Sequence, residues 1–243
     1  MCTGRVDPRY VFRAFTNGMD GVFIGGCRLN ECNYVTQGNY HALNMVLLCR
    51  KIMEHIGLNP SRLRIEFMSS GDGIKFAEAV NDFEKNIEVL GPLGSGEGLD
   101  KEELSPRLEQ IYRLIPYIKM EKKEKLRVRH EQGSNYADFF TTDEIDSLFN
   151  DIVSYYIDPE KCQACMICLR KCYVDAIQGG KDLIHIINQE RCIRCGNCFD
   201  ACPEKFSAVQ ELSGVSVPTS IPEGERKVVR KNKKAESKSI SAE

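Results

Sequence analysis

Eight of the twelve cysteines in this chain lie in two runs that share one spacing, C-x2-C-x2-C-x3-C. The second run repeats the first at one constant offset, and the flanking pair Ile157-Asp158 returns at the same offset as Ile187-Asn188. Duplication of a single thiolate-bearing unit explains such a repeat. The two runs are Cys162, Cys165, Cys168 and Cys172, followed by Cys192, Cys195, Cys198 and Cys202.

This spacing is typical of thiolates that hold iron-sulfur clusters. Three thiolates at every third residue wrap their sulfurs around one face of a cubane, and the fourth, after a short helical turn, serves the other cluster. The spacing therefore predicts two 4Fe-4S clusters whose ligand sets cross between the runs. The sets are Cys162, Cys165, Cys168 and Cys202 for one cluster, and Cys192, Cys195, Cys198 and Cys172 for the other. The segment 157–209 resembles the bacterial two-cluster ferredoxin domain, which implies a small α+β unit with pseudo-twofold symmetry.

A structural zinc site is the alternative reading of closely spaced cysteines. Zinc sites use four thiolate or imidazole ligands, usually in two separated C-x2-C pairs. A triplet plus a fourth cysteine, repeated twice, favours iron-sulfur ligation instead. A zinc-binding scaffold whose basic tail holds nucleic acid remains the rival hypothesis.

Composition and length set the wider frame. The chain has 243 residues, a length that is typical of two modules. Of these residues 42% are apolar and 28% charged, which are ordinary values for a globular protein. It has neither an apolar run long enough to cross a bilayer nor a signal peptide, so we expect a cytoplasmic protein without a membrane span. In a reducing compartment, twelve cysteines favour metal ligation over disulfides. The basic segment 210–243 is predicted to be a disordered tail that does not bind nucleic acid.

Residues 1–92 alternate between helical and strand patterns. A helix is predicted from Pro8 to Gly18 behind the N-cap Asp7, and a longer one from Tyr40 to Ile56. Strands are predicted at 22–26 and 63–67, and a third helix turns its apolar residues inward and ends at Gly91. This order predicts an open parallel α/β sheet. The inward residues of the third helix are Phe76, Val80, Phe83, Ile87 and Leu90.

The segment 93–156 is predicted to be a helical linker. Residues 91–98 are rich in glycine but lack the Gly-Lys-Ser/Thr ending of a phosphate loop, so they indicate a flexible connection. Residues 99–126 form a helical pattern, and Thr141 with Glu144 makes a capping box for a helix to about Tyr155. We expect these helices to pack the two domains together or to dock a partner.

Four cysteines lie outside the two runs. Cys27 and Cys32 follow the strand at 22–26, and loops at the carboxyl ends of parallel strands build functional sites. Cys2 precedes the first helix. Cys49 lies on the apolar face of the second helix, which indicates a packed core thiol. The four histidines form no i, i+4 pair and are expected in surface or core roles.

The N-terminal motifs resemble one known family. They are C-x-G-R-V-D-P at residues 2–8, G-C-x4-C at 26–32 and Gly38-Asn39-Tyr40, and they resemble the delta subunit of methyl-viologen-reducing hydrogenase. The resemblance covers residues 1–92 and implies a 2Fe-2S cluster with Cys2, Cys27 and Cys32 among its ligands. It also implies partners: a flavin-containing heterodisulfide-reductase-like subunit, and a hydrogenase, formate dehydrogenase or NADH-oxidising module.

One departure from the family concerns the N-terminus. Members of the family carry an upstream segment with a first β-strand and a cysteine-rich C-C-x2-C element, which this sequence lacks. We therefore expect that Met1 is an internal methionine, that the sheet lacks its first strand, and that the 2Fe-2S cluster forms only with the upstream cysteines. Some members carry selenocysteine upstream, whose UGA codon resembles a stop, so the upstream DNA tests this expectation.

Taken together, the sequence predicts an iron-sulfur electron-transfer subunit of an anaerobic oxidoreductase complex. It would relay electrons between a hydrogenase or formate dehydrogenase-type module and a heterodisulfide-reductase-like flavoprotein. No residue has the pattern of a catalytic acid, base or nucleophile. Neither the direction of electron flow nor the cluster potentials follow from the sequence.

Overall fold

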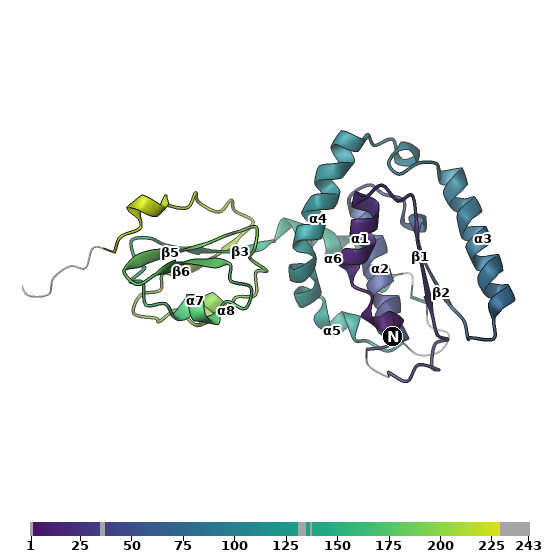
Figure 1. Ribbon diagram of the computed structural model, residues 1–243, viewed down its shortest axis with the longest axis horizontal. Coiled ribbons are helices and arrows are strands. Elements are labelled where there is room, and N and C mark those ends of the chain that lie inside the picture. The colour runs from purple at the N-terminus through teal and green to yellow at the C-terminus, as the bar shows by residue number, and fades with distance from the viewer. Residues whose placement is uncertain (1, 35–36, 131–134, 137, 229–243) are drawn as a thin grey trace, which may run out of the picture. The chain divides into compact units, whose positions relative to one another are not determined.

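The computed structural model divides the chain into two compact units, Met1–Asn150 and Asp151–Glu243 (Figure 1). It describes residues 2–34, 37–130, 135–136 and 138–228. Both units mix helices with short strands, in agreement with the predicted mixture of α and β structure. Met1 and the basic residues from 229 onward, which the tail prediction covers, lie outside the described residues.

The sheet of the first unit has the parallel arrangement that the sequence predicts. Strands β1 (Val22–Gly26) and β2 (Leu63–Phe67) have the expected bounds and pair in register from Val22 opposite Leu63 to Gly26 opposite Phe67. The helix α2 (Asn39–His55) lies between them in the chain and forms the crossover that parallel strands require. A larger open sheet stays a prediction, because the described part of this unit pairs only these two strands.

The core of the first unit lies around α2. This helix is buried on nearly all sides, and it contacts α1 (Pro8–Thr16), β2 and α6 (Thr142–Asn150). The helix α1 starts as predicted, since the side chain of Asp7 accepts a hydrogen bond of 2.9 Å from the Arg9 amide and Pro8 occupies the first turn. The start of α1 therefore lies a few residues after Cys2, and the end of β1 directly precedes Cys27.

The helices predicted as a linker belong to the first unit. The helix α4 (Lys101–Glu121) packs on α1 and is followed by the short α5 (Lys123–Leu126). The prediction that α6 reaches Tyr155 is wrong, because the helix ends at Asn150 and Val153–Ile157 forms strand β3. The β-branched and aromatic side chains within 153–157, which are Val153, Tyr155, Tyr156 and Ile157, favour the strand over a further helical turn.

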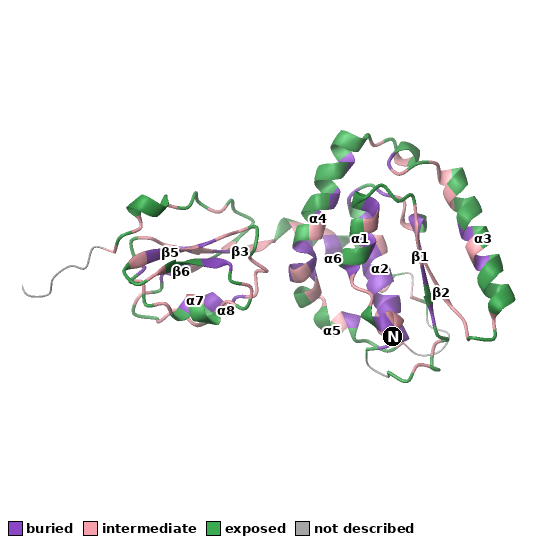
Figure 2. Ribbon diagram, in the orientation of Figure 1, coloured by how far each residue is buried: buried purple, intermediate pink, exposed green. Residues whose placement is uncertain are grey.

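The helix α3 (Gly73–Leu90) is more exposed than its apolar pattern predicts. It covers the sheet on the side opposite α1 and α2, and Figure 2 shows most of its length as exposed. Phe83 is buried and lies 5.6 Å from the ring of Phe23 on β1, whereas Phe76 is 49% exposed. Phe76 faces the sheet as predicted, with its ring 6.3 Å from that of Phe23, but it is only partly covered, since a two-stranded sheet is too narrow to cover the whole apolar face of the helix.

A buried ion pair ties the loops of the first unit together. Arg62, at the start of β2, has no exposed side-chain surface, and its Nε lies 2.6 Å from Oε1 of Glu97. Its guanidinium also donates to the main-chain carbonyls of Asp20, Leu90, Gly91 and Pro92. The start of β2, the loop before β1 and the end of α3 are thus held by one cation.

The second unit has two antiparallel strand pairs. Strand β3 pairs with β6 (Val209–Ser213), and β4 (Ile177–Gly180) pairs with β5 (Leu183–Ile187). Short helices α7 (Ile167–Lys171) and α8 (Asn197–Asp200) lie on one side of the strands. The elements repeat with the cysteines, because β5 follows β3, and the start of α8 follows that of α7, at the offset that separates the two runs.

The described chain continues past β6 and packs on the second unit. Arg226 accepts a hydrogen bond of 2.6 Å from the Ile184 amide, and Val228 donates one of 3.0 Å to Asp182. Lys227 forms an isolated bridge with Leu183 on β5. Residues up to Val228 therefore form part of this unit, whereas the sequence predicted disorder from 210. No helix within the described ranges is long and apolar enough to span a membrane.

We expect Glu97→Ala to destabilise the first unit by about 3–5 kcal/mol. The substitution leaves the buried guanidinium of Arg62 without its anion, and an unpaired buried charge carries a cost of this size. The measurement is urea unfolding of the full chain, and Glu88→Ala is the control because Glu88 is exposed on α3. Equal unfolding midpoints for the two variants would contradict this account.

Candidate metal centres

The two cysteine runs begin with the same backbone turn. The side chains of Asp158 and Asn188 each accept a hydrogen bond of 3.0 Å from the amide two residues further along the chain. Their carbonyls accept hydrogen bonds of 3.0 Å from the amides of Cys162 and Cys192. The first cysteine of each run is therefore held by the same local structure, which the sequence repeat encodes.

Left-handed residues recur between the cysteines. Ala164 and Arg194 have φ of 51° and 58°, and Met166 and Gly196 have φ of 64° and 76°. These conformations turn the chain sharply before α7 and α8, which then carry the third cysteine of each run. The three sulfurs of a run are thus placed by two tight turns and the start of a helix.

The second predicted ligand set lies around one small cavity. Cys172, Cys192, Cys195 and Cys198 all line it, so the structure brings the fourth cysteine of the first run next to the first three of the second. The amide of Ala176 donates to Sγ of Cys172 at 3.2 Å. All four cysteines therefore border the same small space.

The sulfurs of the first predicted set are also neighbours. Burial raises the pKa of Cys168 to about 12, with contributions from the nearby Cys162, Cys165 and Cys202. Burial likewise raises the pKa of Cys198 to about 12, with contributions from Cys192, Cys168 and Cys195. Cys168 of the first set raises the pKa of Cys198 of the second set. The two ligand sets therefore lie next to each other.

The donor chemistry of these sites fits a metal cluster. Thiolates crowded into a buried volume repel one another, so they stay deprotonated only beside a strong positive charge such as bound iron. All twelve cysteines are free thiols, and none forms a disulfide within the described chain. No three histidine, cysteine or carboxylate side chains among the described residues are placed to hold one metal ion. A multi-iron group spaces its ligands differently, since its irons lie between the sulfurs.

A third group of cysteines, the N-terminal triad, comprises Cys2, Cys27 and Cys32. Sγ of Cys2 lies 3.7 Å from Sγ of Cys32. Burial raises the pKa of Cys27, and the sulfurs of Cys32 and Cys2 raise it further. Burial opposes ionisation of Cys32 too, but amide groups of Tyr34 and Asn39 donate to its sulfur and lower its pKa overall. The structure thus brings together the three cysteines that the sequence singled out at this end.

Asn39 positions the triad, although sequence reasoning gave it no role. The residue is 2% exposed at the start of α2, and its side-chain amide donates to the carbonyls of Cys27 at 3.0 Å and Arg28 at 2.6 Å. Gly38, directly before it, lets Cys32 approach closely, since a Cβ at this glycine would lie 2.4 Å from Sγ of Cys32. A polar residue at the first position of an apolar helix was the signal available in the sequence.

Cys49 does not belong to the triad. It is fully buried on α2, and its sulfur lies 3.6 Å from Sδ of Met45. Burial raises its pKa far above the ordinary value, so the thiol stays protonated. The prediction of a packed core thiol is confirmed.

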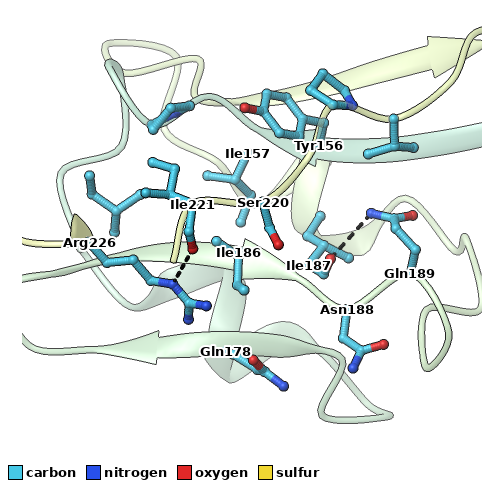
Figure 3. Close-up of a pocket in the computed structure, with 14 residues that line it drawn as sticks. Tyr156, Ile157, Gln178, Ile186, Ile187, Asn188, Gln189, Ser220, Ile221 and Arg226 are labelled. Atoms are coloured by element: carbon cyan, nitrogen blue, oxygen red, sulfur yellow. Dashed lines mark hydrogen bonds between the residues drawn. The ribbon is translucent and has the colours of Figure 1, made fainter. Parts of the chain in front are cut away.

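A cavity of about 370 Å³ lies between the strands of the second unit and the segment 217–226 (Figure 3). Tyr156, Ile186 and Asn188 line it, and Arg226 donates to the Ile221 carbonyl at 2.8 Å beside it. No cysteine is among its lining residues. This cavity therefore belongs to the packing of the C-terminal segment and is separate from the candidate metal centres.

Comparison with known families divides the chain in the same way as its cysteines. Residues 1–91 match the family model of the methyl-viologen-reducing hydrogenase delta subunit. Residues 161–206 match that of a 4Fe-4S dicluster domain, so such a domain is present.

Relatives with names are similar to the N-terminal part. An iron-sulfur subunit of the F420-non-reducing hydrogenase of Archaeoglobus profundus is 45% identical over 91 residues, which are 37% of this chain and 66% of that protein. The vhu iron-sulfur subunit of the F420-non-reducing hydrogenase of Methanococcus maripaludis is 41% identical over 37% of this chain and 67% of its own length.

A larger protein contains a similar segment. It is a subunit of the ferredoxin/F(420)H(2)-dependent CoB-CoM heterodisulfide reductase of Methanosarcina acetivorans, and it is 40% identical over 95 residues, which are 39% of this chain and 12% of that protein. The chain therefore spans just under two thirds of the Archaeoglobus relative and about an eighth of the Methanosarcina one.

We expect Gly196→Ala to destabilise the second unit by about 1–2 kcal/mol, because a side chain in the left-handed region carries a cost of this size. The new Cβ would also lie 3.0 Å from the hydroxyl of Tyr155. Thermal unfolding of anaerobically purified full-length protein measures the effect. Gly180→Ala is the matched control, since a Cβ there makes an ordinary contact of 3.6 Å with Leu183. A Gly196→Ala protein at least as stable as this control would refute the argument.

Proposed function

Because the chain belongs to the family of methyl-viologen-reducing hydrogenase delta subunits, we propose that it relays electrons within an anaerobic oxidoreductase complex. Its partners in this proposal are a hydrogenase, formate dehydrogenase or NADH-oxidising module on one side and a heterodisulfide-reductase-like flavoprotein on the other. The names of the relatives, which are parts of a hydrogenase and of a heterodisulfide reductase, support these two kinds of partner.

One observation carries the proposal. The two runs are separate in sequence, yet they fold so that Cys172 of one run joins Cys192, Cys195 and Cys198 of the other around one cavity. This crossing is what two adjacent 4Fe-4S clusters need, and it lies within the segment that matches a dicluster domain. In the proposal, the other cluster is held by Cys162, Cys165, Cys168 and Cys202.

The clusters supply one-electron chemistry, since they accept and donate single electrons at potentials set by charge, hydrogen bonds to sulfur and solvent exposure. The residues of this chain provide the rest. The thiolates bind iron, the turns at Ala164 and Arg194 fix their spacing, and the apolar residues of β3 and β5 keep water from the buried sulfurs. The neighbouring positions of Cys168 and Cys198 give a short path between the two sites.

The N-terminal triad is the site of a third cluster in this proposal. A 2Fe-2S cluster takes four ligands, and Cys2, Cys27 and Cys32 contribute three of them. Their convergence and the hydrogen bonds from Asn39 that hold the Cys27 loop support this role. A reducing compartment such as the cytoplasm would keep all of these thiols reduced.

The rival function is that of a zinc-binding scaffold. It shares the requirement for thiolate ligands but predicts a colourless protein with stoichiometric zinc and no redox activity. The match to a dicluster domain favours iron.

We expect the protein, purified anaerobically, to be brown and to contain about eight irons in the second unit, as two cubanes require. Cys198→Ser should remove about half of that iron together with one electron paramagnetic resonance signal of the dithionite-reduced protein. Cys49→Ser is the control, because Cys49 lies in the core of the first unit. Colourless wild-type protein with bound zinc would overturn the proposal in favour of the scaffold.

Asn39→Ala tests the third site. In a protein that includes the upstream cysteines, we expect it to lower the iron bound at the N-terminal triad while the two 4Fe-4S signals remain, because the Cys27 loop loses its buried donor. Each lost hydrogen bond of this kind is worth about 1 kcal/mol. Asn86→Ala, on the exposed surface of α3, is the control. Unchanged signals from all sites in Asn39→Ala would refute the positioning role.

A further inference from the structure

Two polar side chains reach the sulfurs of the candidate cluster sites at positions that the sequence repeat does not share. His185, on β5, is fully buried, and its Nδ1 lies 3.5 Å from Sγ of Cys168. Asn197, at the start of α8, donates from Nδ2 to Sγ of Cys195 at 3.2 Å. Each side chain contacts a different one of the two ligand sets.

The residues at the equivalent positions of the repeat differ in chemistry and in contacts. Tyr155 occupies the position equivalent to His185 in the first half of the repeat, and its hydroxyl donates to Oε2 of Glu211 at 3.1 Å. Ile167 is the equivalent of Asn197 and has no polar side-chain atom. The second half of the repeat therefore carries both donors, one directed at each ligand set, and the first half carries neither.

The chain makes room for the His185 ring. A Cβ at Gly179 would lie 1.9 Å from Cδ2 of His185, so only glycine fits at this position on β4. Among the residues that the structure describes, Nε2 of the buried ring has no hydrogen-bond partner. The ring is therefore buried with one nitrogen unpartnered and the other against a sulfur. Because an unpartnered buried nitrogen is unfavourable, apolar packing alone does not explain a histidine at this position.

The chemistry of the sulfur decides which group donates. A thiolate bound to iron carries no proton, so it can only accept, and Nδ1 of His185 must carry the hydrogen. Nε2 then bears a lone pair, which suits a neutral ring in a buried place.

We propose that His185 and Asn197 set the reduction potentials of the two 4Fe-4S clusters independently, each by one side-chain hydrogen bond to a ligand sulfur. The inference rests on the proposed function. On reduction one electron enters the cluster, negative charge on its sulfurs grows, and no bond forms or breaks and no proton moves. Because an N–H donor binds a more negative sulfur more strongly, each bond stabilises the reduced form and raises the potential.

The test is a redox titration of the anaerobically purified full chain, followed by electron paramagnetic resonance. His185→Leu should lower one of the two one-electron midpoints, so that the ratio of reduced to oxidised cluster falls about tenfold at fixed potential, or ~59 mV. Asn197→Ile, which installs the residue of the equivalent position, should lower the other midpoint by a similar amount. The double variant should lower both.

Two further variants serve as controls. Tyr155→Phe removes a hydroxyl that contacts Glu211 and no ligand sulfur, so both midpoints should stay in place. His185→Gln keeps an N–H donor and should shift its midpoint less than His185→Leu does. The inference is overturned if His185→Leu and Asn197→Ile lower the same midpoint, if neither shifts one, or if Tyr155→Phe matches His185→Leu.

A second measurement covers the case in which His185→Leu loses its iron. Histidine labelled with ¹⁵N in the wild-type chain should show a hyperfine coupling to a reduced 4Fe-4S cluster, because His185 is the histidine of the second unit. A wild-type protein with both clusters and no such coupling overturns the inference alone. A wild-type protein without iron overturns the proposed function instead.

Discussion

Repulsion among buried thiolates is the constraint on which the second unit depends. Burial and the neighbouring sulfurs raise the pKa of both Cys168 and Cys198, so these groups favour the protonated form when no metal is near. A small domain of this size has little apolar core with which to hold them apart. In the proposed clusters, bound iron would neutralise these ligands and hold together chain segments that apolar packing alone joins only weakly.

The first unit buries a positive charge, whereas the second unit buries groups that become negative when they ionise. It buries a guanidinium, that of Arg62, and compensates it with the Glu97 carboxylate and a ring of main-chain carbonyls. The network holds the loop before β1, the start of β2 and the end of α3, whereas the opposite, carboxyl end of β1 leads directly into the loop of Cys27. In the first unit the buried charge of Arg62 holds these loops, and in the second unit the proposed iron would do the same for the cysteine loops.

Local patterns predicted the elements and the grouping of the cysteines, whereas tertiary contacts decided the rest. A short buried run predicted β1, the alternation of Leu63, Ile65 and Phe67 with charged residues predicted β2, and the cysteine spacing predicted that Cys172 would join the second run. The exposure of Phe76 was not predicted, because an apolar helical face does not reveal how wide a sheet lies beneath it. Asn39 and His185 were missed because their roles arise from residues that are distant in sequence, Cys27 and Cys168.

The proposed exchange of the fourth cysteine between the two runs means that neither half of the repeat completes a ligand set by itself. A single repeat unit on its own would have three ligands on one side and a fourth aimed away from them, so it could not complete a site. Two copies related by a twofold axis would complete each other by trading that cysteine. The present domain thus has the form that two such copies would take if joined in one chain, and His185 and Tyr155 contact different partners at equivalent positions of the two halves.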